Sequence, residues 1–130
     1  MAVSIASSAL SCTIADRSVA NADGQSGEIE LAALDLYDAQ GRFIERITLT
    51  GDQHAISLDL RHLIPHLLAR PCAAIILRHR HPSGLAEPSR ADIATTRNLA
   101  GILRLIGIRL QDHLIEGGRC QFSFRAAGLI

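Results

Sequence analysis

The sequence has no lysine and no tryptophan, and it contains only one tyrosine and three phenylalanines. Aromatic residues make up 3% and hydrophobic residues 48%, so the core must be built from Leu, Ile, Val and Ala, a composition that suits an α/β fold. The 13 basic residues, all arginine, are balanced by 13 acidic residues. No net charge therefore draws the whole chain to nucleic acid or to an anionic membrane.

Cysteines and long apolar runs are also scarce. Cys12, Cys72 and Cys120 are odd in number and lack a CxxC spacing, which argues against a disulfide framework or a thiolate zinc site and favours a reducing compartment. No stretch approaches the roughly 18 uninterrupted apolar residues of a membrane span. The first residues carry no basic group before their apolar part and no A-x-A-like cleavage site, so we expect a cytoplasmic protein.

The length of 130 residues fits one domain. Residues 1–27 are rich in Ala, Ser, Asn, Asp and Gly without a sustained period, and we expect them to form a flexible N-terminal tail. The folded domain is then expected over residues 28–130.

The hydrophobic pattern predicts a β-hairpin, a helix, a strand, a long helix and a second β-hairpin, in that order. The predicted strands are 28–37, 42–50, 72–79, 108–116 and 119–124, and the predicted helices are 57–70 and 89–106. The run 72–79 is apolar enough for a central strand covered on both faces. Pro65 should kink the first helix or mark where it restarts.

Two histidines and an aspartate form the most informative group. His79 and His81 are two residues apart in an extended segment, so their imidazoles project from the same side. Asp92 lies in the first turn of the following helix, where the loop can bring its carboxylate back toward the strand end. Catalytic zinc uses such three-ligand sets and leaves a fourth position for water. The sequence therefore predicts a zinc site made of these three residues.

Glu30 is the candidate general base. It shares a predicted strand face with apolar residues, where an ionised carboxylate is costly unless it has a polar partner, and a metal-activated water would be one. Glu28 is a rival base on the same face, at the frayed end of the strand. Ser89 and Asp92 have the spacing of a capping box, and the Ser89 hydroxyl could cap the helix while donating its proton to a developing oxyanion.

Each of these residues also has a purely structural interpretation. Ser89 and Asp92 could only cap a helix, and a histidine pair beside a loop could be exposed without binding metal. Asp112 and His113 could orient a ligand or form an ordinary polar pair in a strand. Three further histidines lack spacing to an acidic partner and are expected to be helix-surface or satisfied residues: His54, His62 and His66.

These residues resemble the C-terminal domain of bacterial RadC proteins, which belong to the JAB/MPN (JAMM) superfamily. The superfamily motif is a glutamate on an early strand followed by H-x-H, seven residues, Ser, two residues and Asp; HRHPSG at 79–84 and EPSRAD at 87–92 satisfy the spacing without a gap. The resemblance covers roughly residues 28–130. Further matches to the RadC pattern are Thr95-Thr96, LIGI at 105–108, Asp112-His113 and FSF at 122–124.

The resemblance implies a single MPN/JAB-like domain, similar to cytidine deaminases, with a mixed β-sheet flanked by helices. It implies a JAMM-type zinc hydrolase, a metallopeptidase or isopeptidase acting on a peptide or protein substrate. His79, His81 and Asp92 would hold Zn²⁺. Glu30 would be the general acid/base and Ser89 the oxyanion stabiliser.

The sequence departs from the RadC pattern in three places. Arg80 replaces the usual Asn between the two histidines and adds a cation beside the site. The Pro-Arg-Glu element expected before strand 72–79 is missing. The helix-hairpin-helix segment that precedes this domain in full-length RadC is not among these 130 residues. DNA binding, which the DNA-repair label of RadC proteins would suggest, is therefore in doubt for this sequence.

Two other functions remain open at this point. One is a DNA-associated accessory module acting through Arg78, Arg80 and Arg90, for which the neutral net charge gives no support. The other is a metal-free MPN scaffold that binds a protein partner. The presence or absence of bound metal separates the hydrolase from the scaffold.

Overall fold

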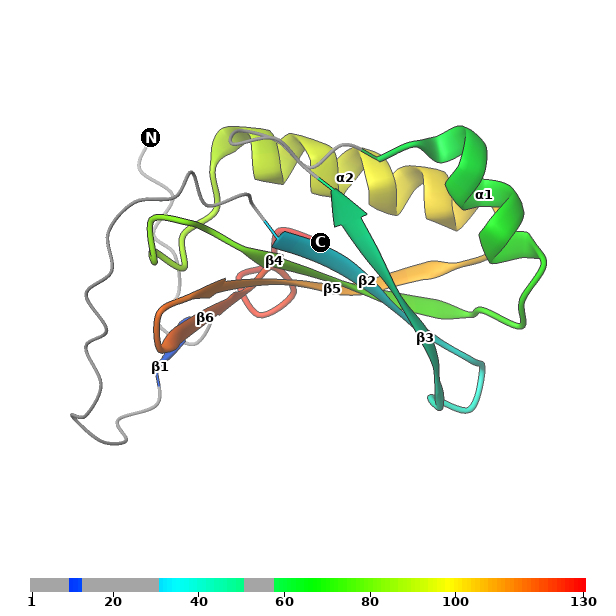
Figure 1. The fold of residues 1–130 in the computed structure, drawn as a ribbon, viewed down its shortest axis with the longest axis horizontal. Helices are drawn as coiled ribbons and strands as arrows, with labels where there is room; N and C mark the ends of the chain where they lie inside the picture. The colour runs from blue at the N-terminus through cyan, green and yellow to red at the C-terminus, as the bar shows by residue number, and fades with distance from the viewer. Residues whose placement is uncertain (1–9, 13–30, 51–57) are drawn as a thin grey trace.

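The computed structural model describes residues 10–12, 31–50 and 58–130. These residues form strands of a single sheet and two helices (Figure 1). In chain order the elements are β1 (Leu10–Cys12), β2 (Leu31–Tyr37), β3 (Phe43–Thr50), α1 (Leu60–Leu68), β4 (Ala74–Arg80), α2 (Arg90–Leu105), β5 (Arg109–Gly117) and β6 (Cys120–Ser123).

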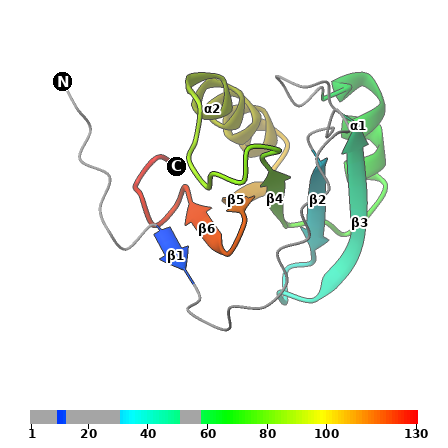
Figure 2. The ribbon, with the colours of Figure 1, turned by 60° about the vertical axis from the view of Figure 1, so that its left-hand side comes forward.

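The six strands lie in the order β1-β6-β5-β4-β2-β3. β4 and β5 are parallel and every other neighbouring pair is antiparallel, so the sheet is mixed. Figure 2 shows this order, with both helices on the same side of the sheet. The architecture is α/β with a mixed sheet, as predicted, although the two helices cover one face and do not flank both.

The predicted order of elements is confirmed from β2 onward. α2 is one residue shorter than the predicted range 89–106 at each end. Its predicted capping box is present, with Ser89 as the cap residue. α1 continues through Pro65 as one helix, so the proline does not mark a restart. Leu63 and Leu67, before and after the proline, are both buried in the core, which compensates for the backbone hydrogen bond that a proline cannot donate.

The main core lies between the helices and the sheet. Alternation along β2 and β4 sends every second side chain toward the helices, where leucine and isoleucine are fully buried. The buried members of this cluster are Leu34, Leu36, Leu63, Leu67, Ile75, Leu77, Leu99, Leu103, Ile108 and Leu110. This packing fixes the end of β4 beneath the start of α2.

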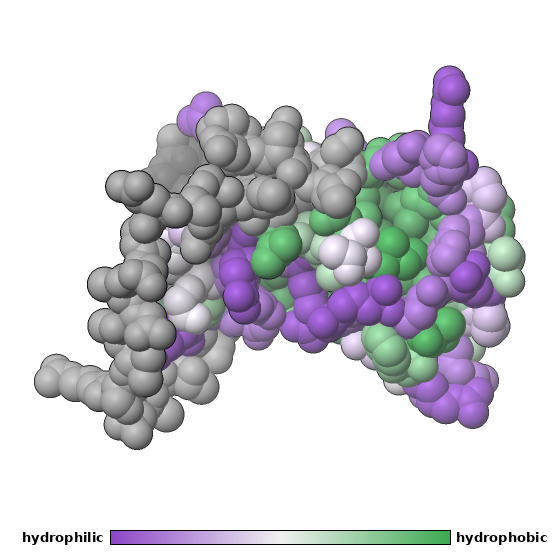
Figure 3. Space-filling view, in the orientation of Figure 1, coloured by the Kyte–Doolittle hydropathy of each residue, from purple (hydrophilic) through white to green (hydrophobic). Residues whose placement is uncertain are grey.

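The opposite face of β4 differs from the prediction. Ile76 and Arg78 are only partly buried there and Arg80 is exposed, so β4 is not covered on both faces within the described residues. The arginines are tolerated because carboxylates of the neighbouring strands pair with them: Asp35 with Arg78, and Glu116 with both arginines. Figure 3 shows a band of hydrophilic side chains bordered by apolar surface on the side of the molecule that it presents.

β1 lies inside the segment 1–27 that was predicted to be a tail. It pairs with β6 and places Cys12 opposite Cys120 in the register. Cys120 is disulfide-bonded and Cys72 is a free thiol, so a disulfide is present although the cysteine pattern argued against a disulfide framework. Sequence spacing could not indicate this, because directly opposite residues on antiparallel strands can be far apart in the chain. The rest of the predicted tail lies outside the described residues.

None of the helices in the described ranges is both long enough and apolar enough to cross a bilayer.

Candidate metal centre

The end of β4 and the start of α2 bring the predicted ligands together. His79 follows Ile75 and Leu77 on the helix-facing side of β4, so its ring lies in the interior and is 1% exposed. His81 comes just after the strand. The loop then returns the chain to α2, whose first turn carries Asp92.

The three side chains are close enough to share one ion. The Nδ1 atom of His79 lies 3.5 Å from Oδ1 of Asp92, and the Nε2 atom of His81 lies 3.2 Å from Oδ2 of Asp92. One ligand atom from each residue can be chosen so that all lie within 4.8 Å of one another. Ligands that share a zinc ion at about 2 Å each lie roughly 3–4 Å apart, so small side-chain adjustments would complete the site.

The loop orients the His81 ring. Its Nδ1 atom lies 3.1 Å from the carbonyl oxygen of Leu85, and a carbonyl can only accept, so Nδ1 donates to it. Nε2, which faces Asp92, is therefore the ring nitrogen available to a metal ion. This loop packs directly on Gly117 of β5. A Cβ atom at Gly117 would lie 2.3 Å from the backbone nitrogen of Ala86, so only glycine allows this approach.

Asp92 is held by the start of its own helix. Its Oδ2 atom accepts a hydrogen bond from the Ser89 N–H at 2.7 Å, and the Ser89 hydroxyl accepts one from the Asp92 N–H at 3.0 Å. Burial alone would raise the pKa of Asp92. The hydrogen bonds from Ser89 and the charges of His79 and His81 outweigh burial and leave the pKa below its ordinary value. The carboxylate is therefore ionised and ready to bind a cation.

A second layer of buried polar groups supports the ligands. The Thr96 hydroxyl donates to the backbone oxygen of Asp92 at 2.5 Å and accepts from Nδ1 of His113, 2.7 Å away. The His113 ring stacks between His79 and Phe124. Burial, reinforced by charge on His79, lowers the pKa of His113 to about 3, so the ring is neutral.

The two residues of the Asp112-His113 pair have different roles. His113 lies against a candidate ligand, whereas the Asp112 carboxylate bonds to the end of the neighbouring strand. Its Oδ2 atom accepts from the Ser123 hydroxyl at 2.6 Å and its Oδ1 atom accepts from the Arg125 N–H at 3.0 Å. Neighbouring residues of a strand point to opposite faces, which separates the two side chains.

Thr96 and Gly117 are the residues of this site that sequence reasoning did not assign. Thr96 belongs to the buried stripe of α2, which runs through Asp92, Thr96, Leu99 and Leu103 at helical spacing. A polar residue in that stripe, four positions after a candidate ligand, is a signal the sequence contains. Gly117 lies between the predicted strands 108–116 and 119–124, and its contact with the loop is visible only in three dimensions.

The proposed base is not among the described residues. Glu30 and its rival Glu28 both lie outside the described ranges, so the structure brings together His79, His81, Asp92 and Ser89 and leaves the assignment of the base a prediction.

Arg80 lies away from the ligands that flank it in sequence. Its side chain is 65% exposed and pairs with Glu116 at 3.5 Å on the open face of the sheet. Arg78 also belongs to that face, where its Nε atom lies 2.7 Å from Asp35. The cation that replaces the usual Asn is therefore on the opposite side of β4 from the ring of His79.

Two histidines on α1 have acidic partners, so the expectation that they lack one is wrong; for His62 the i,i+3 spacing from Asp59 could have indicated it. His62 lies 2.6 Å from a carboxylate oxygen of Asp59, the cap residue of the helix. His66 lies 2.8 Å from Glu45 on β3. Both are satisfied residues on a helix, as expected, while His54 lies outside the described residues.

Comparison with known proteins places this fold and site in a family. The sequence model of the RadC-like JAB domain family matches residues 10–129. The chain belongs to this family. The match also includes β1, so the RadC-like JAB domain begins within the segment predicted to be a tail.

Several curated proteins are similar to this RadC-like JAB domain. A UPF0758 protein of Coxiella burnetii is 38% identical over 122 residues, which cover 93% of this chain and 54% of that protein. UPF0758 protein YkfG of Escherichia coli is 42% identical over 94 residues, covering 72% of this chain and 60% of that protein. A UPF0758 protein of Aromatoleum aromaticum is 44% identical over 97 residues, covering 73% of this chain and 43% of that protein. The chain thus spans about half the length of these relatives.

Proposed function

We propose that this RadC-like JAB domain is a zinc-dependent hydrolase of the JAMM type that cleaves an amide or isopeptide bond in a peptide or protein substrate. The observation that carries the proposal is the convergence of His79, His81 and Asp92 at the end of β4 and the start of α2. Membership of the RadC-like JAB domain family supports it.

The donor set fits zinc. It offers two imidazole nitrogens and one carboxylate, the ligand number and types that catalytic zinc sites use, with one coordination position left over. The Leu85 carbonyl keeps Nε2 of His81 directed toward Asp92, and the cap contacts keep Asp92 ionised. A bound zinc ion would lower the pKa of a coordinated water to about 7 and polarise a substrate carbonyl.

Ser89 and Glu30 would supply the remaining chemistry. Because the Ser89 hydroxyl accepts the Asp92 N–H, its own proton can be donated to the oxygen of the attacked carbonyl as negative charge develops there. Glu30 would take a proton from the attacking water and pass it to the leaving amine. Its position in the chain supports this role, since it precedes Leu31, which lies opposite Arg80 between the two histidines.

Metal content is the first test. After zinc reconstitution and removal of loose ions, elemental analysis of the purified protein should give about one zinc per chain, and His81→Ala should lose it because only two ligands remain. His62→Ala is the matched control, since His62 also contacts a carboxylate but lies on α1. Wild-type protein that retains no zinc after reconstitution would contradict the proposal.

Turnover is the second test. A panel of fluorogenic peptides and isopeptide-linked peptides would be screened with the reconstituted protein. Glu30→Gln should keep zinc and lower the rate on any cleaved substrate by about 10²–10⁴-fold, the usual contribution of a general acid/base. Glu28→Gln, the same change two residues away, should keep the wild-type rate. The reverse result would move the base to Glu28, and equal rates in all three proteins would remove both glutamates from the mechanism.

A further inference from the structure

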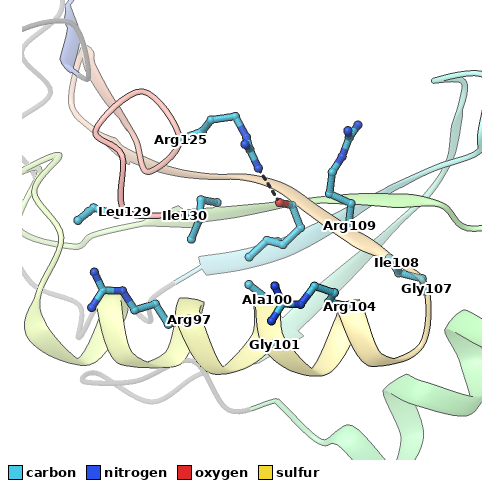
Figure 4. Close-up of a pocket in the computed structure, with 11 residues that line it drawn as sticks. Arg97, Ala100, Gly101, Arg104, Gly107, Ile108, Arg109, Arg125, Leu129 and Ile130 are labelled. Atoms are coloured by element: carbon cyan, nitrogen blue, oxygen red, sulfur yellow. Dashed lines mark hydrogen bonds between the residues drawn. The ribbon is translucent and has the colours of Figure 1, made fainter.

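A second concave site lies along α2, apart from the metal centre. It is a groove of about 580 Å³ between α2, the start of β5 and the C-terminal segment 125–130 (Figure 4). Neither the candidate ligands nor Ser89 line it. We call it the arginine groove, because four arginines line it: Arg97, Arg104, Arg109 and Arg125.

The charge of the arginine groove is not neutralised by the described residues. None of its lining residues is acidic, and none of its four arginines forms an ion pair with a described residue. Arg97 and Arg104 are exposed and lie two helical turns apart on one face of α2, a distance of about 10 Å. A chain with equal numbers of acidic and basic residues thus has three arginine side chains around one hollow, those of Arg97, Arg104 and Arg125.

Arg125 is held in place on the wall opposite α2. The guanidinium of Arg125 donates to the backbone oxygen of Gln111 and, at 3.1 Å, to that of Leu110, as the dashed line in Figure 4 marks for Leu110. Arg109 lines the groove beside Leu110, but its side chain points away from α2 in Figure 4 and donates to the side-chain oxygen of Gln111 at 3.4 Å. Neutral acceptors orient the Arg125 side chain without cancelling its charge, so it can still attract an anion.

The remaining lining of the arginine groove is aliphatic or backbone. Leu129 and Ile130 lie between the arginines in Figure 4. Gly101 lies between Arg97 and Arg104 on α2, and a Cβ atom there would meet nothing within 4 Å. A glycine inside a helix costs about 1 kcal/mol relative to alanine, and no neighbour requires this one. Gly101 therefore keeps the groove open at the expense of helix stability.

We propose that the arginine groove binds an acidic peptide segment of a partner protein, with an aliphatic side chain seated against Gly101. The spacing of Arg97 and Arg104 lies between that of residues two and four positions apart in an extended peptide. Carboxylates four positions apart share a face with the residue midway between them and would reach both arginines through flexible side chains. The lining contains no aromatic ring on which a nucleobase could stack, which favours a peptide over a single nucleic-acid strand. The proposal does not depend on the hydrolase.

Binding would be measured by fluorescence anisotropy with the full chain. The probe is a short fluorescein-labelled peptide that has two glutamates four positions apart with a leucine midway between them. Three comparison probes replace both glutamates by lysine, replace the leucine by serine, or use a single-stranded oligonucleotide. The glutamate-leucine peptide should bind more tightly than each of these, and its affinity should fall as salt is raised.

Two variants test the location. Arg97→Glu should weaken peptide binding by at least about tenfold, because it replaces an attractive charge by a repulsive one. The matched control is Arg61→Glu, the same charge reversal at an exposed position of α1, which should leave the affinity within about twofold. Gly101→Leu should also weaken binding by about tenfold by filling the groove, and circular dichroism should show a helix at least as stable as in wild type.

Several results would overturn the proposal. The proposal fails if wild-type protein does not bind the glutamate-leucine peptide at low salt. It also fails if Arg97→Glu and Arg61→Glu change the affinity for this peptide equally. Tighter binding of the oligonucleotide, lost in Arg97→Glu, would assign the arginine groove to nucleic acid instead. Zinc-stripped protein should bind the peptide as well as the zinc-loaded form, so this test is independent of the metal centre.

Discussion

Asp35 is a buried carboxylate that two arginines share. It is 2% exposed, and Arg46 of β3 contacts both of its oxygens at 2.6 and 2.8 Å while Arg78 of β4 contacts one at 2.7 Å. The hydrogen bonds from Arg46 outweigh burial and, with those from Arg78, lower the pKa of Asp35 below its ordinary value of 3.8. This single residue therefore links three strands on the open face of the sheet.

We predict that Asp35→Asn lowers the free energy of unfolding by about 2 kcal/mol at pH 7, because two partly exposed arginines lose their common anion. A depressed folded-state pKa stabilises the fold above the unfolded value of 3.8, and this stabilisation is lost as pH falls through the lower, folded value. Urea unfolding from pH 7 to pH 3 should therefore show the difference between wild type and variant shrinking in acid. The exposed Glu87→Gln is the control, and a difference that stays constant with pH would contradict the prediction.

At the scale of elements, the loop from His81 to Ser89 determines whether β4 and α2 can share a ligand. It has to bring the Leu85 carbonyl to His81 and deliver Ser89 to the cap of α2. The path of this loop depends on Gly117 of β5, because the backbone of residues 84–86 packs directly against this glycine. A glycine on β5 thus determines the path of the loop that connects β4 to α2.

Gly117→Ala tests this dependence. The new Cβ would lie 2.3 Å from Ala86 N, so the loop must move and the bond between His81 and Leu85 should be lost. We expect at least about tenfold weaker zinc binding, in line with the usual cost of losing a group that orients a ligand, measured by competition with a chromogenic chelator. Gly101→Ala is the control, because its Cβ meets no atom within 4 Å; it should keep zinc affinity and stabilise α2 by about 0.5–1 kcal/mol. Unchanged affinity in Gly117→Ala would show that the loop does not orient His81.

At the scale of the whole molecule, α2 connects two different sites. Its first turn contributes Asp92 to the metal centre, and its exposed face from Arg97 to Arg104 lines the arginine groove. The buried face of the same helix packs on the sheet through Leu99 and Leu103. Because an ion at the metal centre would join β4 to α2, its binding should stabilise the packing of the helix layer on the sheet.

Zinc should therefore raise the stability of the entire fold. With free zinc at 100 times its dissociation constant, the free energy of unfolding should increase by about 2.7 kcal/mol, provided that the unfolded chain does not bind the ion. Urea titrations with zinc and with a chelator measure the difference. His62→Ala should retain the increase and His81→Ala should lose it. An equal increase in His81→Ala would mean that zinc stabilises the protein from another position.

The local sequence pattern by itself determined much of the secondary structure and of the candidate metal site. Hydrophobic periodicity predicted the order of elements from β2 to β6, and the spacing of His79, His81, Ser89 and Asp92 predicted the ligand group and the cap of α2. These features depend on neighbours within a dozen or so positions along the chain, where strand alternation and helix geometry dictate which side chains meet.

Tertiary structure decided what depends on distant segments. It placed both helices on one face of the sheet, which left the face that carries Arg80 open, and it put Gly117 under the loop. The arginine groove likewise combines α2, the start of β5 and the C-terminal segment. The physical reason is that the sequence pattern states which face of an element is apolar, whereas the partner of that face is chosen by packing and charge pairing across the whole fold.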